Sequence, residues 1–285
     1  MTEFQLVKSR RAPRGVGPRG FAPEPGRMTR GVILGVVGVV FIVPILAMIE
    51  FSLRVGQNGG HGFDHYFAAF TPATSGTYSV LFQGIGNSLG ICAITVIIVL
   101  GLLLPTMILV ELRFPRLRSV LEFVCLVPIT IPSIVLVVGF VPVYSAVAQI
   151  FGSYPWTLSF AVGIIVLPYA FRPIASNLSA VEVVVLSEAS RSLGESWASV
   201  MIRIILPNLR RGIFSSAFIT IAVVLGEYTI ASFLSQNTFQ TALVLLRSTD
   251  PYVAVIFAVF ALLFAFVLLI LIGRIGTAGH DRRSS

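Results

Sequence analysis

The sequence predicts an all-α polytopic membrane protein with six transmembrane helices and a helical cytoplasmic loop between spans four and five. The first reason is composition: hydrophobic residues make up 56% of the chain and charged residues only 11%, whereas soluble domains carry about 25% charged residues. The second reason is distribution, because the apolar residues form blocks of roughly the 20 residues that cross a hydrocarbon core. These blocks lack the alternating polar residues of barrel strands, so a β-barrel is excluded.

The first 30 residues are basic and interrupted by four prolines. A segment of this composition cannot bury a core, so residues 1–30 are expected to form a disordered cytoplasmic tail. The apolar run that follows is too long for the hydrophobic region of a cleaved signal peptide, and further apolar runs follow it. Residues 31–275 are expected to form the membrane domain, and residues 276–285 a short cytoplasmic tail.

The six spans are expected at residues 31–53, 84–110, 119–148, 156–175, 212–234 and 252–273. An even number of spans places both termini on one side of the membrane. With that side inside, 18 of the Lys and Arg residues lie on the cytoplasmic side and two outside, which is the positive-inside pattern. The net charge of +8 therefore reflects residues at the ends of apolar blocks, so the expected surroundings are a lipid bilayer and no nucleic acid partner is expected.

The third span carries three prolines, Pro128, Pro132 and Pro142. Each removes a backbone donor and kinks the helix, which a membrane tolerates only where protein or water satisfies the freed carbonyl groups. Two interpretations remain open for Pro128 and Pro132. They produce either a packing kink or a broken helix that lines a solute path.

Glu227 is a rare acidic residue within a span, about 15 residues into the fifth one. At 1.5 Å per residue it lies roughly 22 Å from the cytoplasmic end. Its two interpretations are a structural pairing and a role in a solute path or gate. In a solute path, the carboxylate and the neighbouring Tyr228 would favour a cation.

The sequence gives little support for a metal site, a reactive cysteine or a catalytic site. His61 and His65 have the spacing of a helical pair of metal ligands, but without a third ligand nearby an exposed loop or helix face is the favoured interpretation, so no metal site is expected. Cys92 and Cys125 are expected to be small buried hydrophobic residues. Since Lys8 is the only lysine, the chain has no phosphate-binding loop, and neither catalytic residues nor a cofactor is expected.

Between spans four and five lie about 36 residues, with the loop proper at residues 182–211. A helix is expected over residues 182–193, followed by Gly194, which supplies the positive φ that ends a helix without a Cβ penalty. A second helix then runs to Pro207, which stops or kinks it. The first helix has one apolar face with Val184, Val185, Ala189 and Leu193, and the second repeats Trp197, Val200, Met201, Ile204 and Ile205 at helical spacing.

This helical pair has two possible interpretations. One is an amphipathic hairpin that rests on the membrane surface. The other is a plug for a protein socket. Mixed charge around the turn, from Glu188, Arg191 and Glu195, favours the protein socket, since a lipid-facing hairpin would carry basic residues there.

The loop resembles the signature of bacterial ABC-importer permeases of type I, which reads E-A-A, three residues, G, nine residues, I-x-L-P. The corresponding residues keep every spacing, and one residue departs from the pattern, with Ser190 in place of the second alanine. The segments P-I-T-I-P-S-I-V and L-P-Y-A-F-R-P also resemble that family, over residues 87–273 as a whole. The matching residues are Glu188, Ala189, Ser190, Gly194, Ile204, Leu206 and Pro207.

The resemblance implies a multi-pass bacterial inner-membrane permease whose loop couples to a separate ATP-hydrolysing subunit. Glu188, Ala189 and Gly194 would form the docking turn, and Leu206 and Pro207 would lead back to span five. The implied partners are two ATPase subunits, a second permease subunit (another chain or a copy of this one) and an external solute-binding protein. Such a chain is a transport subunit and no enzyme.

The segment G-E-Y-T-I-A-S-F-L also resembles the spermidine/putrescine-type permeases, which implies a polyamine or another small cation as the solute. Permeases for ferric iron, thiamine or aminoethylphosphonate are similar and remain alternatives. A different class also remains open: a self-sufficient secondary transporter or channel that uses Glu227 for ion or proton coupling.

Overall fold

The computed structural model describes residues 26–55, 60–71, 76 and 78–277 of the chain. Most of the expected N-terminal tail and of the expected C-terminal tail therefore lies outside the described residues. The chain divides into two compact units, Met1–Ala47 and Met48–Ser285.

The first unit consists of most of helix α1 (Arg27–Leu53). The helix begins four residues before the expected start of span one and contains Pro44. Its apolar side chains, such as Phe41 at 69% exposure, point outward. An outward apolar surface along a helix of this length suits a hydrocarbon environment.

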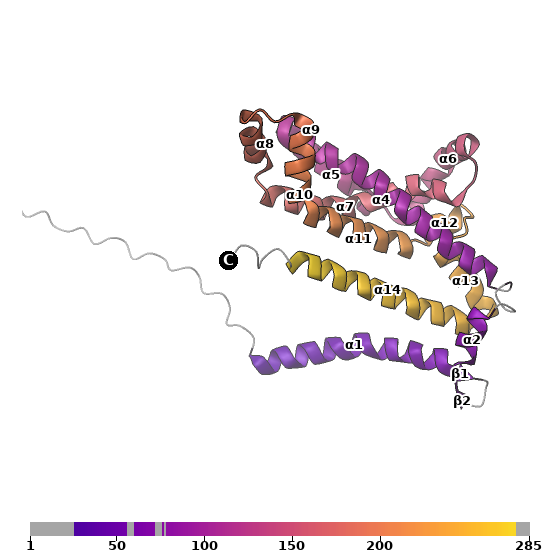
Figure 1. The fold of residues 1–285 in the computed structure, drawn as a ribbon. Coiled ribbons are helices and arrows are strands. Elements are labelled where there is room, and N and C mark those ends of the chain that lie inside the picture. Colours follow the sequence, from indigo (N-terminus) through magenta and orange to yellow (C-terminus); the bar gives the residue numbers. More distant parts are fainter. Residues whose placement is uncertain (1–25, 56–59, 72–75, 77, 278–285) are drawn as a thin grey trace, which may run out of the picture. The chain divides into compact units, whose positions relative to one another are not determined.

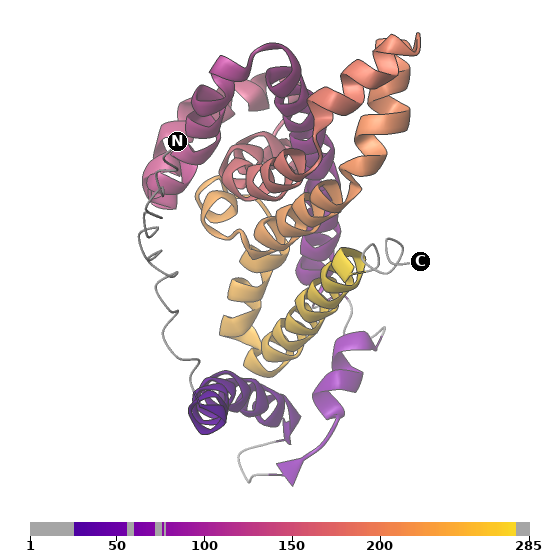
Figure 2. The ribbon, with the colours of Figure 1, turned by 90° about the vertical axis from the view of Figure 1, so that its left-hand side faces the viewer.

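Three long helices form the core of the second unit: α4 (Ser79–Arg113), α7 (Leu158–Ala180) and α11 (Arg210–Gly226) (Figure 1 and Figure 2). Small and polar residues let α7 and α11 approach closely. A Cβ at Gly212 would lie 2.8 Å from the Cβ of Asn177, and the Gly212 N–H donates to Asn177 Oδ1 at 3.1 Å. Ser216 Oγ donates to the Ala170 carbonyl at 3.0 Å, which joins the same two helices.

The expected third span is two helices, α5 (Arg118–Thr130) and α6 (Ser133–Phe151), preceded by a short 3₁₀ turn, η1 (Pro115–Leu117). The break falls at Ile131, which is extended with φ −103° and ψ 126°. The cause is Pro132, because a proline disfavours helical geometry in the residue before it. The helix is therefore broken before Pro132, whereas a place for Pro128 and Pro132 along a solute path stays a prediction.

The fifth span is shorter than expected. Helix α11 ends at Gly226, Glu227 is extended with ψ 113°, and a separate short helix, α12 (Thr229–Phe233), follows. Further helices are η2 (Pro155–Thr157) before α7, then α13 (Phe239–Thr249) and α14 (Pro251–Thr277). Within the described ranges, five helices are long and apolar enough to span a membrane, and six if the bent pair Trp197–Asn208 and Arg210–Gly226 is one span.

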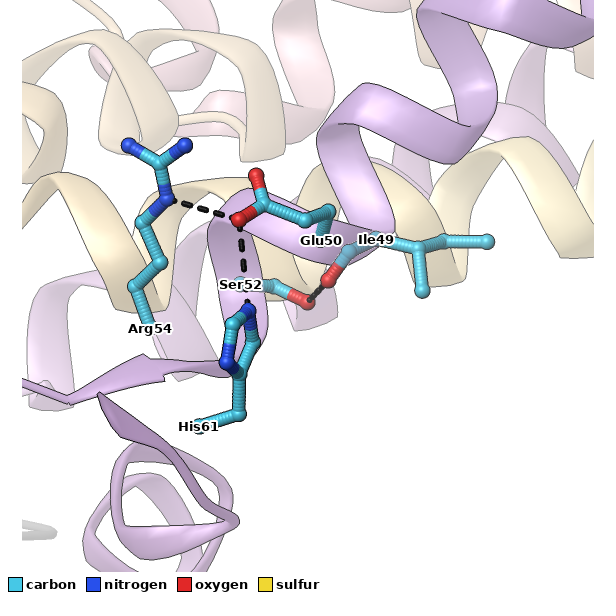
Figure 3. A network of polar contacts seen from close by, with 5 residues as sticks. All are labelled: Ile49, Glu50, Ser52, Arg54 and His61. Atoms are coloured by element: carbon cyan, nitrogen blue, oxygen red, sulfur yellow. Dashed lines mark hydrogen bonds and ion pairs between the residues drawn. The ribbon is translucent and has the colours of Figure 1, made fainter. Parts of the chain in front are cut away.

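The segment after α1 forms a two-stranded antiparallel pair, β1 (Arg54–Val55) and β2 (Gly60–His61), and a short helix, α2 (Asp64–Phe70). Glu50 joins the two strands, since its Oε1 accepts from Arg54 Nε at 2.8 Å and contacts His61 Nε2 at 3.3 Å (Figure 3). This hydrogen bond raises the pKa of Arg54 above its ordinary value.

His65, on α2, points elsewhere and stacks on Tyr252 with ring centroids 4.5 Å apart. The two histidines of the i, i+4 pair thus have different partners, since His61 contacts Glu50. No group of three or more His, Cys, Asp or Glu side chains that could hold a metal occurs among the described residues. Cys92 and Cys125 are free and buried, as expected.

Helix α13 is hydrogen-bonded to the first turns of α4. Asn87 Nδ2 donates to the Asn237 carbonyl at 2.8 Å, and the Phe239 N–H donates to Ser88 Oγ at 2.9 Å. Tyr78 donates to Asp250 Oδ2 at 2.9 Å, and burial together with this bond raises the pKa of Tyr78 to about 12. The tyrosine therefore stays a protonated donor at neutral pH.

We expect Gly84→Val to destabilise this junction, because a Cβ at Gly84 would lie 2.7 Å from the Thr238 carbonyl oxygen. Overpacking of this kind costs about 1–3 kcal/mol. Thermal unfolding of the purified chain in detergent measures the loss. The control is Gly86→Val, where a Cβ meets nothing within 4 Å; equal midpoints for the two variants would contradict the prediction.

Candidate functional site

The segment between α7 and α11 begins with helix α8 (Val183–Ser192) and a glycine turn. Gly194 has φ +89°, a conformation that costs other residues about 1–2 kcal/mol. The Gly194 N–H donates to the Arg191 carbonyl at 3.0 Å, and the Glu195 N–H to the Ser190 carbonyl at 3.2 Å. These two bonds are those of the Schellman motif, so the expected helix and turn are confirmed.

The apolar residues predicted for one face of α8 are exposed. Val185 is 57% exposed and Leu193, at the turn, 86%. The residues that α8 buries are Val183 and Ser187, at 2% and 3% exposure. The turn therefore presents aliphatic side chains outward, and the helix is held by a different and narrower face.

The second limb differs from the expected regular helix. It consists of α9 (Trp197–Ser199), a π-helix, η3 (Val200–Ile205), and α10 (Leu206–Asn208). Val200 and Ile205, five residues apart, are both fully buried, a spacing that a π-helix brings onto one face. Pro207 lies inside the last turn, and the limb meets α11 at a bend of 69°. Of the two expectations for Pro207, the kink is therefore the one that the structure supports.

We name the unit formed by α8, the Gly194 turn, α9, η3 and α10 the hairpin. Its expected site residues fall into two groups. Glu188, Ala189 and Gly194 are exposed around the turn, whereas Ile204 and Leu206 are half-buried at the base beside the exposed Pro207. Ser190, the departure from the motif, is half-buried and donates from Oγ to the Leu186 carbonyl at 2.7 Å.

A cluster of three residues at the hairpin was not anticipated from the sequence. The guanidinium carbons of Arg113 and Arg191 each lie 5.1 Å from the centroid of the Trp197 ring. Arg191 Nη1 also donates to the Glu195 carbonyl at 3.3 Å. A cavity of about 360 Å³ adjoins the cluster, lined by Leu112, Arg113, Val184, Ser187, Glu188, Arg191 and Trp197.

A second cavity, of about 490 Å³, lies where α5 ends. Arg172 of α7 lines it and pairs with Glu122 of α5, with Nη1 3.8 Å from Oε1. Neither Pro128 nor Pro132 lines the cavity. Both lie two residues from Thr130, the last residue of α5, which does line it. Its lining is Leu126, Ile129, Thr130, Pro168, Tyr169, Arg172, Pro173 and Ile219.

Glu227 and Tyr228 lie at the opposite end of α11 from the hairpin, and neither lines this cavity. Glu227 precedes Tyr228, the N-cap residue of α12, and its carboxylate acts like a cap on the first turn, because Oε1 accepts from the Ile230 N–H at 2.7 Å. Tyr228 is 40% exposed. The interpretation of Glu227 as a structural residue requires a partner within the protein, and the Ile230 N–H is such a partner.

A comparison with protein-family models matches residues 97–285, about two thirds of the chain, to the family described as binding-protein-dependent transport system inner membrane component. The matched region contains the hairpin, the broken third span and both cavities. No curated protein matches the chain.

If Glu227 acts as a cap, its acceptor oxygen matters more than its charge. We expect Glu227→Gln to leave thermal stability within about 0.5 kcal/mol of the parent chain, whereas Glu227→Ala loses about 0.5–2 kcal/mol, the usual effect of removing a cap. Thermal unfolding in detergent distinguishes the two. Equal losses in both variants would show that the carboxylate charge is the stabilising feature.

Proposed function

This chain belongs to the binding-protein-dependent transport system inner membrane components, and on that basis we propose that its hairpin docks on the ATPase subunit of an ABC importer. Membership makes the chain a multi-pass transport component of the bacterial inner membrane and no enzyme. It also implies partners of two kinds, an ATP-binding-cassette ATPase and a solute-binding protein.

The observation that carries the proposal is the contrast between the tip and the base of the hairpin. Near the tip, Leu193 is 86% exposed and Glu188 of α8 is also exposed, so apolar and charged side chains are both available to a protein partner. At the base, the side chains of Val200 and Ile205 are fully buried in the core, at 0% exposure. A docking force on the tip is therefore transmitted to packed helices.

The charge distribution supports a proposal for the orientation, and the family resemblance supports one for the assembly. We propose that the hairpin and both termini face the cytoplasm, supported by the excess of arginine on that side. The full importer would contain two ATPase subunits and a second permease subunit, either another chain or a copy of this one. The solute-binding protein would dock on the opposite side.

For the solute we propose a small cation such as a polyamine, supported by the resemblance of residues 226–234 to spermidine/putrescine-type permeases. Aminoethylphosphonate is a second candidate, and a specific observation favours it. The cavity at the end of α5 is lined by Arg172, whose guanidinium suits a phosphonate oxygen if the solute displaces its exposed partner Glu122, 3.8 Å away. Ferric iron and thiamine have no comparable support.

The docking proposal is tested by capturing the full-length chain from its native membranes. The ATPase subunit and the binding protein should co-purify, and uptake in proteoliposomes should require ATP. Uptake by this chain alone, without ATP or partners, would instead establish the secondary transporter that the sequence left open. A panel of polyamines and phosphonates offered to the captured binding protein identifies the solute.

We expect Gly194→Val to uncouple the importer, because the turn requires φ +89° and a β-branched residue is strained there. Uptake should fall at least tenfold while the variant still inserts into the membrane and ATP hydrolysis continues. Gly101→Val is the matched control, since a Cβ at Gly101 meets nothing within 4 Å.

Glu188→Lys tests the charged part of the same surface and should weaken co-purification of the ATPase. Glu182→Lys, which makes the same charge change at the exposed start of α8, should leave it intact. Normal uptake in a chain that carries both Gly194→Val and Glu188→Lys would refute the docking role.

A further inference from the structure

Helix α4 ends at the hairpin, although it is not one of the two spans that the hairpin joins. Its last residue, Arg113, places its guanidinium carbon 5.1 Å from the centroid of the Trp197 ring. Trp197 is the first residue of α9, on the far side of the Gly194 turn. The contact therefore connects a third spanning helix to the second limb of the hairpin.

Arg191 completes the arrangement from the first limb. Its guanidinium carbon also lies 5.1 Å from the Trp197 ring, while its Nη1 donates to the Glu195 carbonyl across the turn at 3.3 Å. Both arginines occupy the last turn of a helix, α4 and α8, where a positive charge is favoured by the helix dipole. The Trp197 ring thus contacts an arginine at the end of each of two helices, α4 and α8.

From these contacts we propose that Arg113 and Trp197 are positioning residues that fix the angle of the hairpin to α4, so that movement at the docking surface reaches α4 directly. This rests on the proposed docking function and adds a route separate from the chain connections to α7 and α11. A cation–π contact between arginine and an indole ring suits this role. The attraction acts over the whole ring face, so it holds the two side chains together through small lateral shifts while the guanidinium stays solvated.

The consequences for transport differ from those of a lost docking contact. Without Arg113 the ATPase should still bind the exposed tip, because Leu193 and Glu188 are unchanged. A contact of this strength corresponds to about a two- to fivefold effect when exposed. We therefore expect Arg113→Gln to lower uptake per ATP hydrolysed about two- to fivefold at unchanged ATPase binding.

The first experiment measures the contact itself in the full-length chain. With Trp156→Phe, Trp197 is the one remaining tryptophan, and it is 37% exposed. Arg113→Gln uncovers part of the ring, so quenching of its fluorescence by acrylamide should increase. Arg116→Gln is the matched control, an exposed arginine of η1 with the same loss of charge, and it should leave quenching unchanged. Equal quenching in the parent and Arg113→Gln would overturn the contact.

The second experiment measures coupling in the importer captured with its ATPase and reconstituted with its binding protein. Arg113→Gln and Trp197→Leu should each lower uptake per ATP, and the double variant should lose no more than Trp197→Leu alone, since that change already removes the contact with Arg113 together with the one with Arg191. Arg113→Lys keeps the charge and should recover most of the coupling. Additive losses, or unchanged uptake per ATP in Arg113→Gln, would overturn the positioning role.

The two levels of the proposal fail in different ways. If no ATPase co-purifies with the parent chain, the docking function is wrong and this inference falls with it. If the parent is coupled and Gly194→Val uncouples it, but Arg113→Gln behaves like Arg116→Gln, then only the connection to α4 is wrong. Should Arg113→Gln fail to accumulate, Trp197→Leu and Trp197→Phe test the same joint from the other side.

Discussion

The structure depends on the need to satisfy backbone N–H and C=O groups where no water is available. Long helices meet this need internally, and the two breaks in the expected spans meet it in other ways. At the first, Pro132 has no N–H to satisfy, and Thr130 Oγ1 donates to the Val127 carbonyl at 2.7 Å. At the second, the Glu227 carboxylate accepts from the Ile230 N–H. Side chains thus allow the helices to break inside the membrane domain.

Close approach between helices is the second requirement, since apolar surface alone gives no preference for protein over lipid. Gly84, Gly212 and Ser216 provide it. Gly84 lets α4 meet the start of α13, and Gly212 and Ser216 let α11 lie against α7 with hydrogen bonds between the helices. The contacts of Gly212 and Ser216 thus pack together α7 and α11, the two helices that the hairpin joins.

The features of the fold that depend on local sequence patterns could be predicted from the sequence. Apolar blocks locate the spans, and the φ requirement of Gly194 locates the turn between α8 and α9. The end of α11 was missed because residues 226–234 remain apolar while Glu227 ends the helix. The π-helix was missed because Val200 and Ile205 also fit a regular amphipathic pattern. The contact of Arg113 with Trp197 joins residues far apart in the chain, and single-sequence periodicity carries no signal for it.

The exposed tip of the hairpin also bears on how the importer is built. Leu193 at the turn and Val185 near the start of α8 are apolar side chains left uncovered, and apolar surface exposed to water without a partner favours aggregation. On the docking proposed above, a chain without an ATPase partner would leave these side chains in water. Assembly would then cover the same side chains whose exposure marks an unassembled chain, so the proposed interface would also distinguish the two states.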